Sequence, residues 1–215
     1  MTLQTCKRRY SAAVVILAAG RSARMGRPKL LLPWGGTSVL GHLVEQWQGL
    51  RAEQIVVVCA AGDQSLQAEL DRLGFTPQNR IINPAPERGM FSSIQCAARW
   101  RGWQQGLTHW AIVLGDQPHL RRQTLQRVLD FSAAHPTRVC QPARHGHGRH
   151  PVLLPEAMFR RVAVSTAATL SEFLAATPQQ VALCELDDAG LDLDIDCPED
   201  YEKALSLAAN RLSAT

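Results

Sequence analysis

The chain has 215 residues, of which 46% are hydrophobic and 20% are charged, and its formal net charge at pH 7 is +4. These values are ordinary for a globular protein that buries a core. The charge excess is too small to indicate nucleic acid as a partner, and no apolar run is long enough to span a membrane. We therefore expect neither a nucleic-acid-binding protein nor a membrane protein.

The six cysteines are scattered along the chain, so they predict neither a CxxC pair nor a zinc site. Two of them end apolar runs, where buried reduced thiols are common. We therefore expect a reducing, cytoplasmic compartment. The cysteines are Cys6, Cys59, Cys96, Cys140, Cys184 and Cys197.

The first expected element is a buried strand over residues 13–17. Basic residues 7–9 precede the apolar stretch 12–19, a pattern that superficially resembles a signal peptide. The stretch has only eight residues, is β-branched at its centre and runs into Gly20 without a cleavage site, so we favour a strand. Residues 1–11 are then expected to form a flexible N-terminal extension.

Helices are expected to alternate with short apolar strands along the rest of the chain. Residues 142–150, rich in Gly, Arg and His, are expected to form an insertion or a lid. Near-continuous apolar strands between helices indicate a mostly parallel sheet covered on both faces, a Rossmann-like three-layer α/β fold in one domain over residues 1–215. Further strands are expected at 54–59, 80–82, 110–114, 138–141, 151–154 and 181–186, and helices at 37–49, 63–73, 89–105, 121–134, 167–175 and 198–210.

Three segments with charged side chains fall at the carboxyl ends of these strands, where ligands bind in such sheets. They are residues 18–29 after the first strand, 115–118 after the strand WAIVL, and 192–196 before the last helix. Although they are far apart in the sequence, we expect them to converge in space.

The loop AAGRSARMGRPK at residues 18–29 combines two glycines with four basic side chains. Glycines let backbone amides approach an anion, and the basic side chains suit a triphosphate. The spacing fits neither a P-loop nor the GxGxxG dinucleotide motif. A solvated basic turn explains the same composition. The basic residues are Arg21, Arg24, Arg27 and Lys29.

Acidic residues occur in the other two segments. Asp116 in GDQP follows the WAIVL strand, where a carboxylate suits Mg²⁺, although Gly, Asp and Pro also form plain turns. Asp192, Asp194 and Asp196 alternate with apolar residues and share one face of an extended segment, where a cation relieves their repulsion. A solvated strand edge is the other interpretation of this segment.

Two further segments carry candidate binding residues. Ser92 and Ser93 open an expected helix, where hydroxyls and free amides suit a nucleobase or ribose, but plain N-capping needs no ligand. The stretch HGHGRHP at residues 145–151 offers three histidines. A glycine-rich loop supplies zinc geometry poorly, so we do not expect a zinc site there.

Four ordered motifs between residues 17 and 201 resemble those of nucleotidyltransferases of the molybdenum-cofactor type. LAAGRSARMGRPK, which begins at Leu17, is similar to the family loop LAAGxSxRMGxxK, and GDQP is similar to GDxP. NPAPERGMFSSI at 83–94 and DIDCPED at 194–200 are similar to NPxxxxGMxxSI and DIDTPED. Where the family reads GHPVLF, Arg149 replaces the glycine before His150, which suits either a contact with the acceptor's phosphate or a tighter loop.

The resemblance implies a nucleotide-diphospho-sugar transferase-like fold, Mg²⁺ as cofactor and a set of site residues. Catalysis is assigned to Arg24, Lys29 and Asp116, metal binding to Asp116, Asp194 and Asp196, and acceptor binding to Arg149 and His150. Nucleotide binding is assigned to Leu17, Ala18, Ala19, Gly20, Arg21, Ser22, Gly26, Ser92, Ser93 and Gly115.

The implied reaction moves CMP from CTP to the terminal phosphate of molybdenum cofactor, releases pyrophosphate and forms molybdopterin cytosine dinucleotide. CTP is favoured because LAAG loops accompany the cytidylyl branch of the family and LAGG loops the guanylyl branch, and Ala19 stands at the deciding position. A molybdoenzyme maturation chaperone is a further expected partner. The alternatives are GTP with molybdopterin, a sugar or polyol phosphate as acceptor, and a non-catalytic carrier of nucleotide or cofactor.

Overall fold

A mixed β-sheet forms the centre of the computed structural model, which describes residues 10–20 and 23–212. Within these residues the strand order is β10-β7-β9-β6-β1-β4-β5, and β8 pairs with the end of β7. The strands β2 (Pro33–Trp34) and β3 (Thr37–Ser38) form a separate pair. The strands of the sheet are β1 (Ala12–Ala18), β4 (Gln54–Ala60), β5 (Arg80–Asn83), β6 (His109–Leu114), β7 (Val139–Arg144), β8 (His147–Gly148), β9 (Val152–Pro155) and β10 (Val181–Glu185).

Most neighbouring strands run parallel, as the sequence predicts. β1 pairs in parallel with β4 and β6, β4 with β5, and β7 with β10. β9 runs antiparallel to both β6 and β7, which the sequence pattern does not indicate. The register sets Leu17 beside Val58 and Leu114, so β1 and β6 end side by side. The loops that follow these two strands therefore leave the sheet next to each other.

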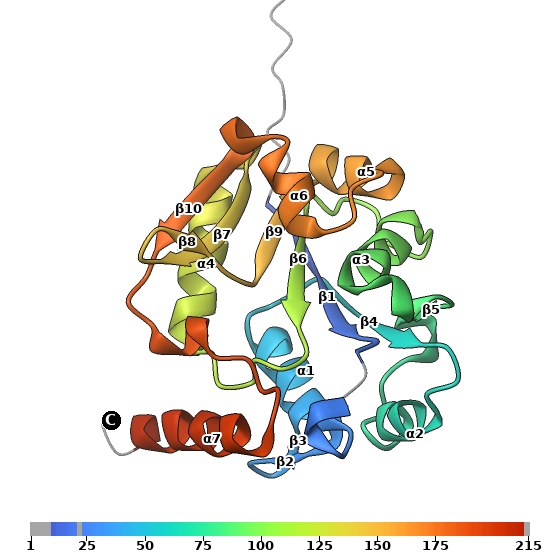
Figure 1. Cartoon of the computed structure of the whole chain (residues 1–215). Coiled ribbons are helices and arrows are strands. Elements are labelled where there is room, and N and C mark those ends of the chain that lie inside the picture. Colours follow the sequence, from blue (N-terminus) through green and yellow to red (C-terminus); the bar gives the residue numbers. More distant parts are fainter. Residues whose placement is uncertain (1–9, 21–22, 213–215) are drawn as a thin grey trace, which may run out of the picture.

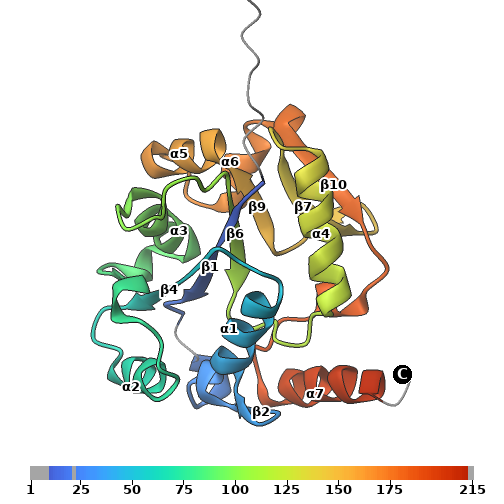
Figure 2. The same ribbon diagram turned by 180° about the vertical axis from the view of Figure 1, so that it is seen from behind.

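Helices cover both faces of the sheet and complete a three-layer arrangement. Helices α3, α5 and α6 lie on the face toward the viewer in Figure 1, and α1 and α4 lie on the face seen in Figure 2. Helix α7 runs along the lower edge of the molecule in both views. The helices are α1 (Val39–Gly49), α2 (Gln64–Arg72), α3 (Met90–Arg99), α4 (Arg122–Ala134), α5 (Glu156–Val164), α6 (Leu170–Ala175) and α7 (Pro198–Leu212).

The central strand β1 is buried on both faces, which explains its continuous apolar sequence. Val14 and Ile16 belong to the core cluster that includes α1 and α4. Ala13, Val15 and Leu17 belong to the cluster that includes α3, α5 and α6. Packing on both sides holds the strand in place, so the loop that follows it starts from a fixed point.

Side-chain caps begin two helices close to their expected boundaries. Ser38 Oγ accepts a hydrogen bond from the backbone N–H of Gly41 at 3.0 Å and starts α1. Asp63 Oδ1 accepts from the N–H of Leu66 at 3.0 Å and starts α2. Each cap satisfies a backbone donor that has no partner inside its helix.

The helix expected over residues 89–105 is wrong in its second half. Helix α3 ends at Arg99, because Trp100 has an extended backbone with ψ 141°. The Trp100 ring packs edge-on against the Trp103 ring at a centroid distance of 5.0 Å, and Trp103 packs in turn against Trp110. Aromatic packing therefore overrides the helical pattern in this segment.

The second half of the chain departs from expectation in two more places. The expected insertion or lid over residues 142–150 is partly sheet, since β7 continues to Arg144 and turns into β8. Helix α5 was not predicted from the sequence, although Met158, Phe159 and Val162 form its buried face. The chain therefore uses this region to extend both the sheet and the layer of helices.

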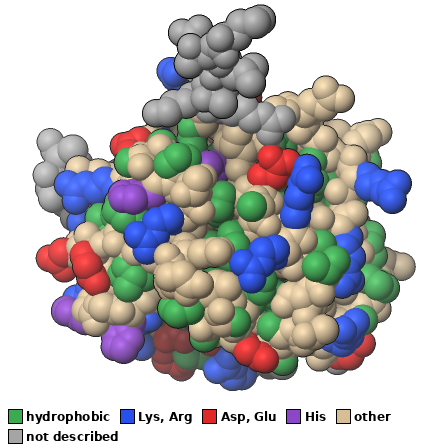
Figure 3. Space-filling model, turned by 90° about the horizontal axis from the view of Figure 1, so that it is seen from above, with side chains coloured by type: hydrophobic (Ala, Val, Ile, Leu, Met, Phe, Trp, Pro, Cys, Tyr) green, Lys and Arg blue, Asp and Glu red, His purple; other side chains and the backbone are tan. Residues whose placement is uncertain are grey.

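The five cysteines within the described residues are free, and Cys59 and Cys140 are buried as predicted. Over residues 10–20 and 23–212, no helix has the length and apolar character needed to cross a membrane. Lys and Arg side chains are dispersed over the face in Figure 3.

Of the expected N-terminal extension only Tyr10 and Ser11 are described, and the backbone N–H of Ser11 donates to Thr108 Oγ1 at 3.0 Å.

Leu153→Ala in β9 should lower the free energy of unfolding by about 2–5 kcal/mol, because it removes contacts of a side chain that is fully buried and leaves a cavity. The matched control is Leu183→Ala in β10, where the side chain is 40% exposed and the expected loss is about 1 kcal/mol or less. Urea denaturation measures both variants. Equal losses would contradict the assigned burial.

The stability of the fold should fall in mild acid because of His109. This residue is 2% exposed, and burial lowers its pKa to about 4. The fold favours the neutral ring, so its contribution is complete above the unfolded pKa of about 6.5 and is lost as the pH falls toward 4. His109→Phe should flatten this part of the stability profile in urea denaturation. A profile with the same slope in both proteins would refute this assignment.

Candidate active site

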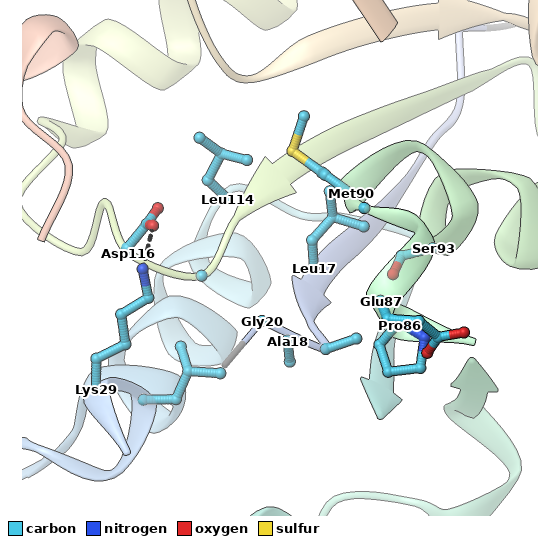
Figure 4. A pocket seen from close by; sticks show the side chains of 14 residues that line it. Leu17, Ala18, Gly20, Lys29, Pro86, Glu87, Met90, Ser93, Leu114 and Asp116 are labelled. Carbon is cyan, nitrogen blue, oxygen red and sulfur yellow. Dashed lines mark hydrogen bonds and ion pairs between the residues drawn. The ribbon is translucent and has the colours of Figure 1, made fainter. Parts of the chain in front are cut away.

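A cavity of about 400 Å³ opens where β1 and β6 end, facing the start of α3. Figure 4 shows Lys29 and Asp116 on one side of it and Pro86, Glu87 and Ser93 on the other. The loop after β1 and the GDQP turn thus share one cavity. Its lining residues are Leu17, Ala18, Ala19, Gly20, Lys29, Leu30, Pro86, Glu87, Gly89, Met90, Ser93, Leu114, Gly115 and Asp116.

Gly115 allows the two strand ends to approach closely. A Cβ atom at this position would lie 2.7 Å from Leu30 Cδ2 and 2.8 Å from the backbone oxygen of Leu17. Real Cβ atoms do not come this close to backbone, so a larger residue would push the GDQP turn away from the basic loop. The glycine before Asp116 is therefore a steric requirement of the site.

Lys29 connects the basic loop with both acidic segments. Its Nζ lies 2.5 Å from Asp116 Oδ2 and 3.5 Å from Asp196 Oδ1. The side chains of Lys29 and Asp116 are each 17% exposed, so salt screens this pair less than a surface pair. Arg24 adds a second cation, with Nη2 2.8 Å from Asp196 Oδ2. The three segments therefore meet in space, as the sequence predicts.

Backbone and side-chain bonds fix the closing acidic segment against the GDQP turn. The N–H of Ile195 donates to the backbone oxygen of Asp116 at 3.1 Å. Gln117 Nε2 donates to Asp194 Oδ1 at 2.9 Å. Asp194 and Asp196 flank this contact, so both carboxylates are held near Asp116.

Asp116 and the closing segment fit a hard divalent cation. Asp116 Oδ1 is buried and has no hydrogen-bond partner within the described part of the chain. Partial desolvation, and after it the nearby Asp116 carboxylate, raises the pKa of Asp194. A cation would relieve both features. Asp116, together with Asp194 or Asp196, would therefore hold the metal.

The candidate metal site is not closed by protein ligands alone. Residues 10–20 and 23–212 contain no group of three or more His, Cys, Asp or Glu side chains placed to hold a metal ion. Mg²⁺ is usually held by one or two carboxylates together with substrate phosphates. The arrangement is therefore suited to a metal that arrives with a nucleotide.

The start of α3 forms the wall opposite Lys29. Asn83 Nδ2 donates to the hydroxyl oxygens of Ser92 and Ser93, both at 2.9 Å. Ser92 Oγ donates in turn to the backbone oxygen of Gly89 at 2.7 Å. Through these bonds Ser92 holds the loop between Asn83 and Gly89, whereas Ser93 lines the cavity. Gly89 is the N-cap of α3 and no side chain caps it, so the plain N-capping interpretation of the two serines is wrong, and Ser93 remains a candidate contact.

A second cavity of about 560 Å³ adjoins the first, and Met90 lines both. Arg149 and His150, the predicted acceptor residues, line this second cavity. His150 Nδ1 lies 3.2 Å from the backbone oxygen of Ile112. Burial lowers the pKa of His150, against the opposing effects of the Ile112 backbone oxygen and the Asp116 carboxylate.

Most of the predicted nucleotide contacts line the first cavity, but not all of them. Gly26 and Ser92 lie outside its lining, and Arg21 and Ser22 lie outside the described residues. Sequence reasoning missed Pro86, Glu87 and Met90 as lining residues. The available signal was their position after β5, a parallel strand that ends at the same edge of the sheet.

Comparison with known proteins supports this architecture. The family model of the MobA-like NTP transferase domain matches residues 14–181. Nicotine blue oxidoreductase of Paenarthrobacter nicotinovorans is 29% identical over 203 residues, which cover 89% of this chain and 95% of that protein. The bifunctional protein GlmU of Cereibacter sphaeroides is 30% identical over 145 residues, 64% of this chain. The match spans only 31% of the length of GlmU.

Solved structures show the same fold. Rv0371c from Mycobacterium tuberculosis H37Rv has a TM-score of 0.72 and 25% identity, and the match covers 92% of this chain and 98% of that one. A nucleotidyl transferase from Methanothermobacter thermautotroptrophicus has a TM-score of 0.75 and 19% identity, with 94% and 99% covered. These matches confirm the predicted fold class.

The fold and the family match define an α/β protein of the NTP transferase class. Because the family model spans most of its length, the chain belongs to the MobA-like NTP transferase domain family. Lys29, Asp116 and Arg149 lie inside the matched region, and Asp194 and Asp196 lie beyond its end at residue 181.

Asp116→Asn should weaken the binding of Mn²⁺ in the presence of a nucleoside triphosphate by at least about tenfold, because it removes a charged oxygen ligand. The electron paramagnetic resonance signal of free Mn²⁺ measures this affinity. The control is Asp130→Asn on α4, whose side chain is exposed and accepts a bond from Gln126 at 2.9 Å. Equal Mn²⁺ affinity in the two variants would remove Asp116 from the metal site.

Proposed function

We propose that this chain is a cytidylyltransferase that moves CMP from CTP to the terminal phosphate of molybdenum cofactor and releases pyrophosphate. The observation that carries the proposal is the Lys29–Asp116 pair beside a cavity walled by the loop after β1. An ammonium next to a carboxylate with one unpaired oxygen suits a metal-bound triphosphate. Membership of the family supports nucleotidyl transfer, and the LAAG sequence ending at Gly20 supports CTP by its likeness to the cytidylyl branch.

The side chains of this protein bind and orient the triphosphate. Lys29 and Arg24, which pair with carboxylates in this structure, supply positive charge to the phosphates. Asp116 would hold Mg²⁺, which would supply charge neutralisation to the phosphates. An oxygen of the acceptor's terminal phosphate attacks the α-phosphorus in line, and the bond to the leaving pyrophosphate breaks. No protein nucleophile is needed, so catalysis consists of positioning and charge neutralisation.

The second cavity is the proposed acceptor site. It shares Met90 with the first cavity, and His150 is among its lining residues. Arg149 offers a cation at its wall for an anionic group of the acceptor. Leu170 and Leu174 line the same cavity and offer apolar surface to a ring system. This combination favours a phosphorylated heterocycle over a fully hydroxylated sugar.

The name of the Paenarthrobacter relative raises a redox alternative, because that protein matches this chain over nearly its whole length. The loop after β1 does not favour it. Ser22 stands where the dinucleotide motif GxGxxG requires a glycine. The Lys29–Asp116 pair suits phosphate chemistry better than hydride transfer.

The decisive experiment measures pyrophosphate release with Mg²⁺, purified molybdenum cofactor and each of the four triphosphates. CTP should support release. Lys29→Met should lower kcat by about 10²–10³-fold, because it removes charge stabilisation in the transition state. Arg160→Met on α5 is the control, since that side chain is 78% exposed and pairs only with Glu156 among the ion pairs of the described residues.

Each other outcome assigns a different function. Release with GTP alone would place the chain in the guanylyl branch, and release only with a sugar or polyol phosphate would change the acceptor. Nucleotide binding without release would indicate a carrier. Redox turnover of nicotine blue without pyrophosphate release would support the oxidoreductase alternative. Any of these results contradicts the cytidylyltransferase proposal.

A further inference from the structure

Two arginines of the β7–β8 hairpin converge on one aspartate. Arg149 Nε and Nη2 lie 2.9 Å and 2.8 Å from Asp192 Oδ1. Arg144 Nη1 lies 2.5 Å from Asp192 Oδ2. Both carboxylate oxygens are therefore engaged. Donation from Arg144 is the main reason that the pKa of Asp192 lies below its usual range.

Solvent partly screens the ion pairs of this cluster. Its side chains are between 25% and 34% exposed. The backbone on each side has other bonds. The N–H of Arg149 donates to the oxygen of Pro142 at 2.7 Å, and Asp188 Oδ1 accepts from the N–H of Gly190 at 3.0 Å, close to Asp192. Removal of the Asp192 charge therefore leaves the framework in place.

The direction of the Arg149 side chain, in contrast, depends on Asp192. A guanidinium has five N–H donors in a rigid fork. Asp192 engages Nε and Nη2, and Nη1 donates to the backbone oxygen of Gly148 at 3.3 Å. Each terminal nitrogen keeps a second N–H group. The side chain of Arg149 lines the second cavity.

We propose that Asp192 is a positioning residue for the acceptor, because it orients Arg149 to bind an anionic group in the second cavity. The inference rests on the proposed function, in which that cavity receives the acceptor. Two guanidinium groups face the Asp192 carboxylate, and the second nearby carboxylate, Asp187, is fully exposed and 4.0 Å from Arg144. Asp192 itself does not contact the acceptor and acts through Arg149.

Asp192→Asn keeps the shape of the side chain and removes its charge. In the transfer assay with CTP and molybdenum cofactor, KM for the acceptor should rise by about tenfold or more. The values of kcat and of KM for CTP should change by less than about twofold. Asp192→Glu should restore part of the affinity. The control Asp187→Asn removes a fully exposed carboxylate 4.0 Å from Arg144 and should leave all three values unchanged.

Two further measurements separate positioning from a general structural role. Asp192→Asn added to Arg149→Ala should raise the acceptor KM no further than Arg149→Ala alone, because both changes remove the same contact. The Nε–Hε signal of Arg149 in nuclear magnetic resonance should be protected from solvent exchange in the unchanged protein. That protection should disappear in Asp192→Asn.

Two outcomes would overturn this inference while the proposed function stands. One is nucleotide transfer by Asp192→Asn with an unchanged acceptor KM, and the other is additive effects in the double variant. If the unchanged protein transfers nucleotide to no acceptor, the proposed function fails and the inference falls with it. The Arg149 signal distinguishes these cases, because it reports the ion pair without turnover.

Discussion

The ion pair between Lys29 and Asp116 is the constraint on which the candidate site depends. It joins residues that are 87 positions apart in the chain, so it requires β1 and β6 to be neighbours with their carboxyl ends aligned. The parallel register and the small size of Gly115 meet this requirement. A cation from the first loop then faces a carboxylate from the middle of the chain. The rest of the site is arranged around this pair.

The three aspartates of the closing segment, residues 192–196, pair with different parts of the site. Asp196 pairs with cations of the basic loop, on the side of the first cavity. Asp194 accepts from Gln117 beside the GDQP turn. Asp192 holds the arginines of the β7–β8 hairpin, on the side of the second cavity. One short segment thus connects the proposed nucleotide site with the proposed acceptor site.

Sequence reasoning predicts the features that depend on local pattern. Apolar runs locate the central strands, and the rule that ligands bind at carboxyl ends predicts that Lys29, Asp116 and Asp196 meet. It does not predict the antiparallel direction of β9, because periodicity carries no information on strand direction. It also leaves partners undetermined. Alternation predicts that Asp192 and Asp194 share one face of an extended segment, but Asp192 is the last residue of a 3-10 helix over Ala189–Asp192, so that prediction is wrong. Their partners come from elements distant in the chain.

The central claim is that Lys29 and Asp116 together receive a metal-bound nucleoside triphosphate. The most direct measurement is a crystal structure with Mn²⁺ and a CTP analogue whose α,β-bridge cannot be cleaved. The account predicts an anomalous Mn²⁺ peak between Asp116 and the phosphates, with the Lys29 ammonium moved onto the triphosphate. A nucleotide bound elsewhere, with the Lys29–Asp116 pair unchanged and no Mn²⁺ beside it, would contradict the account.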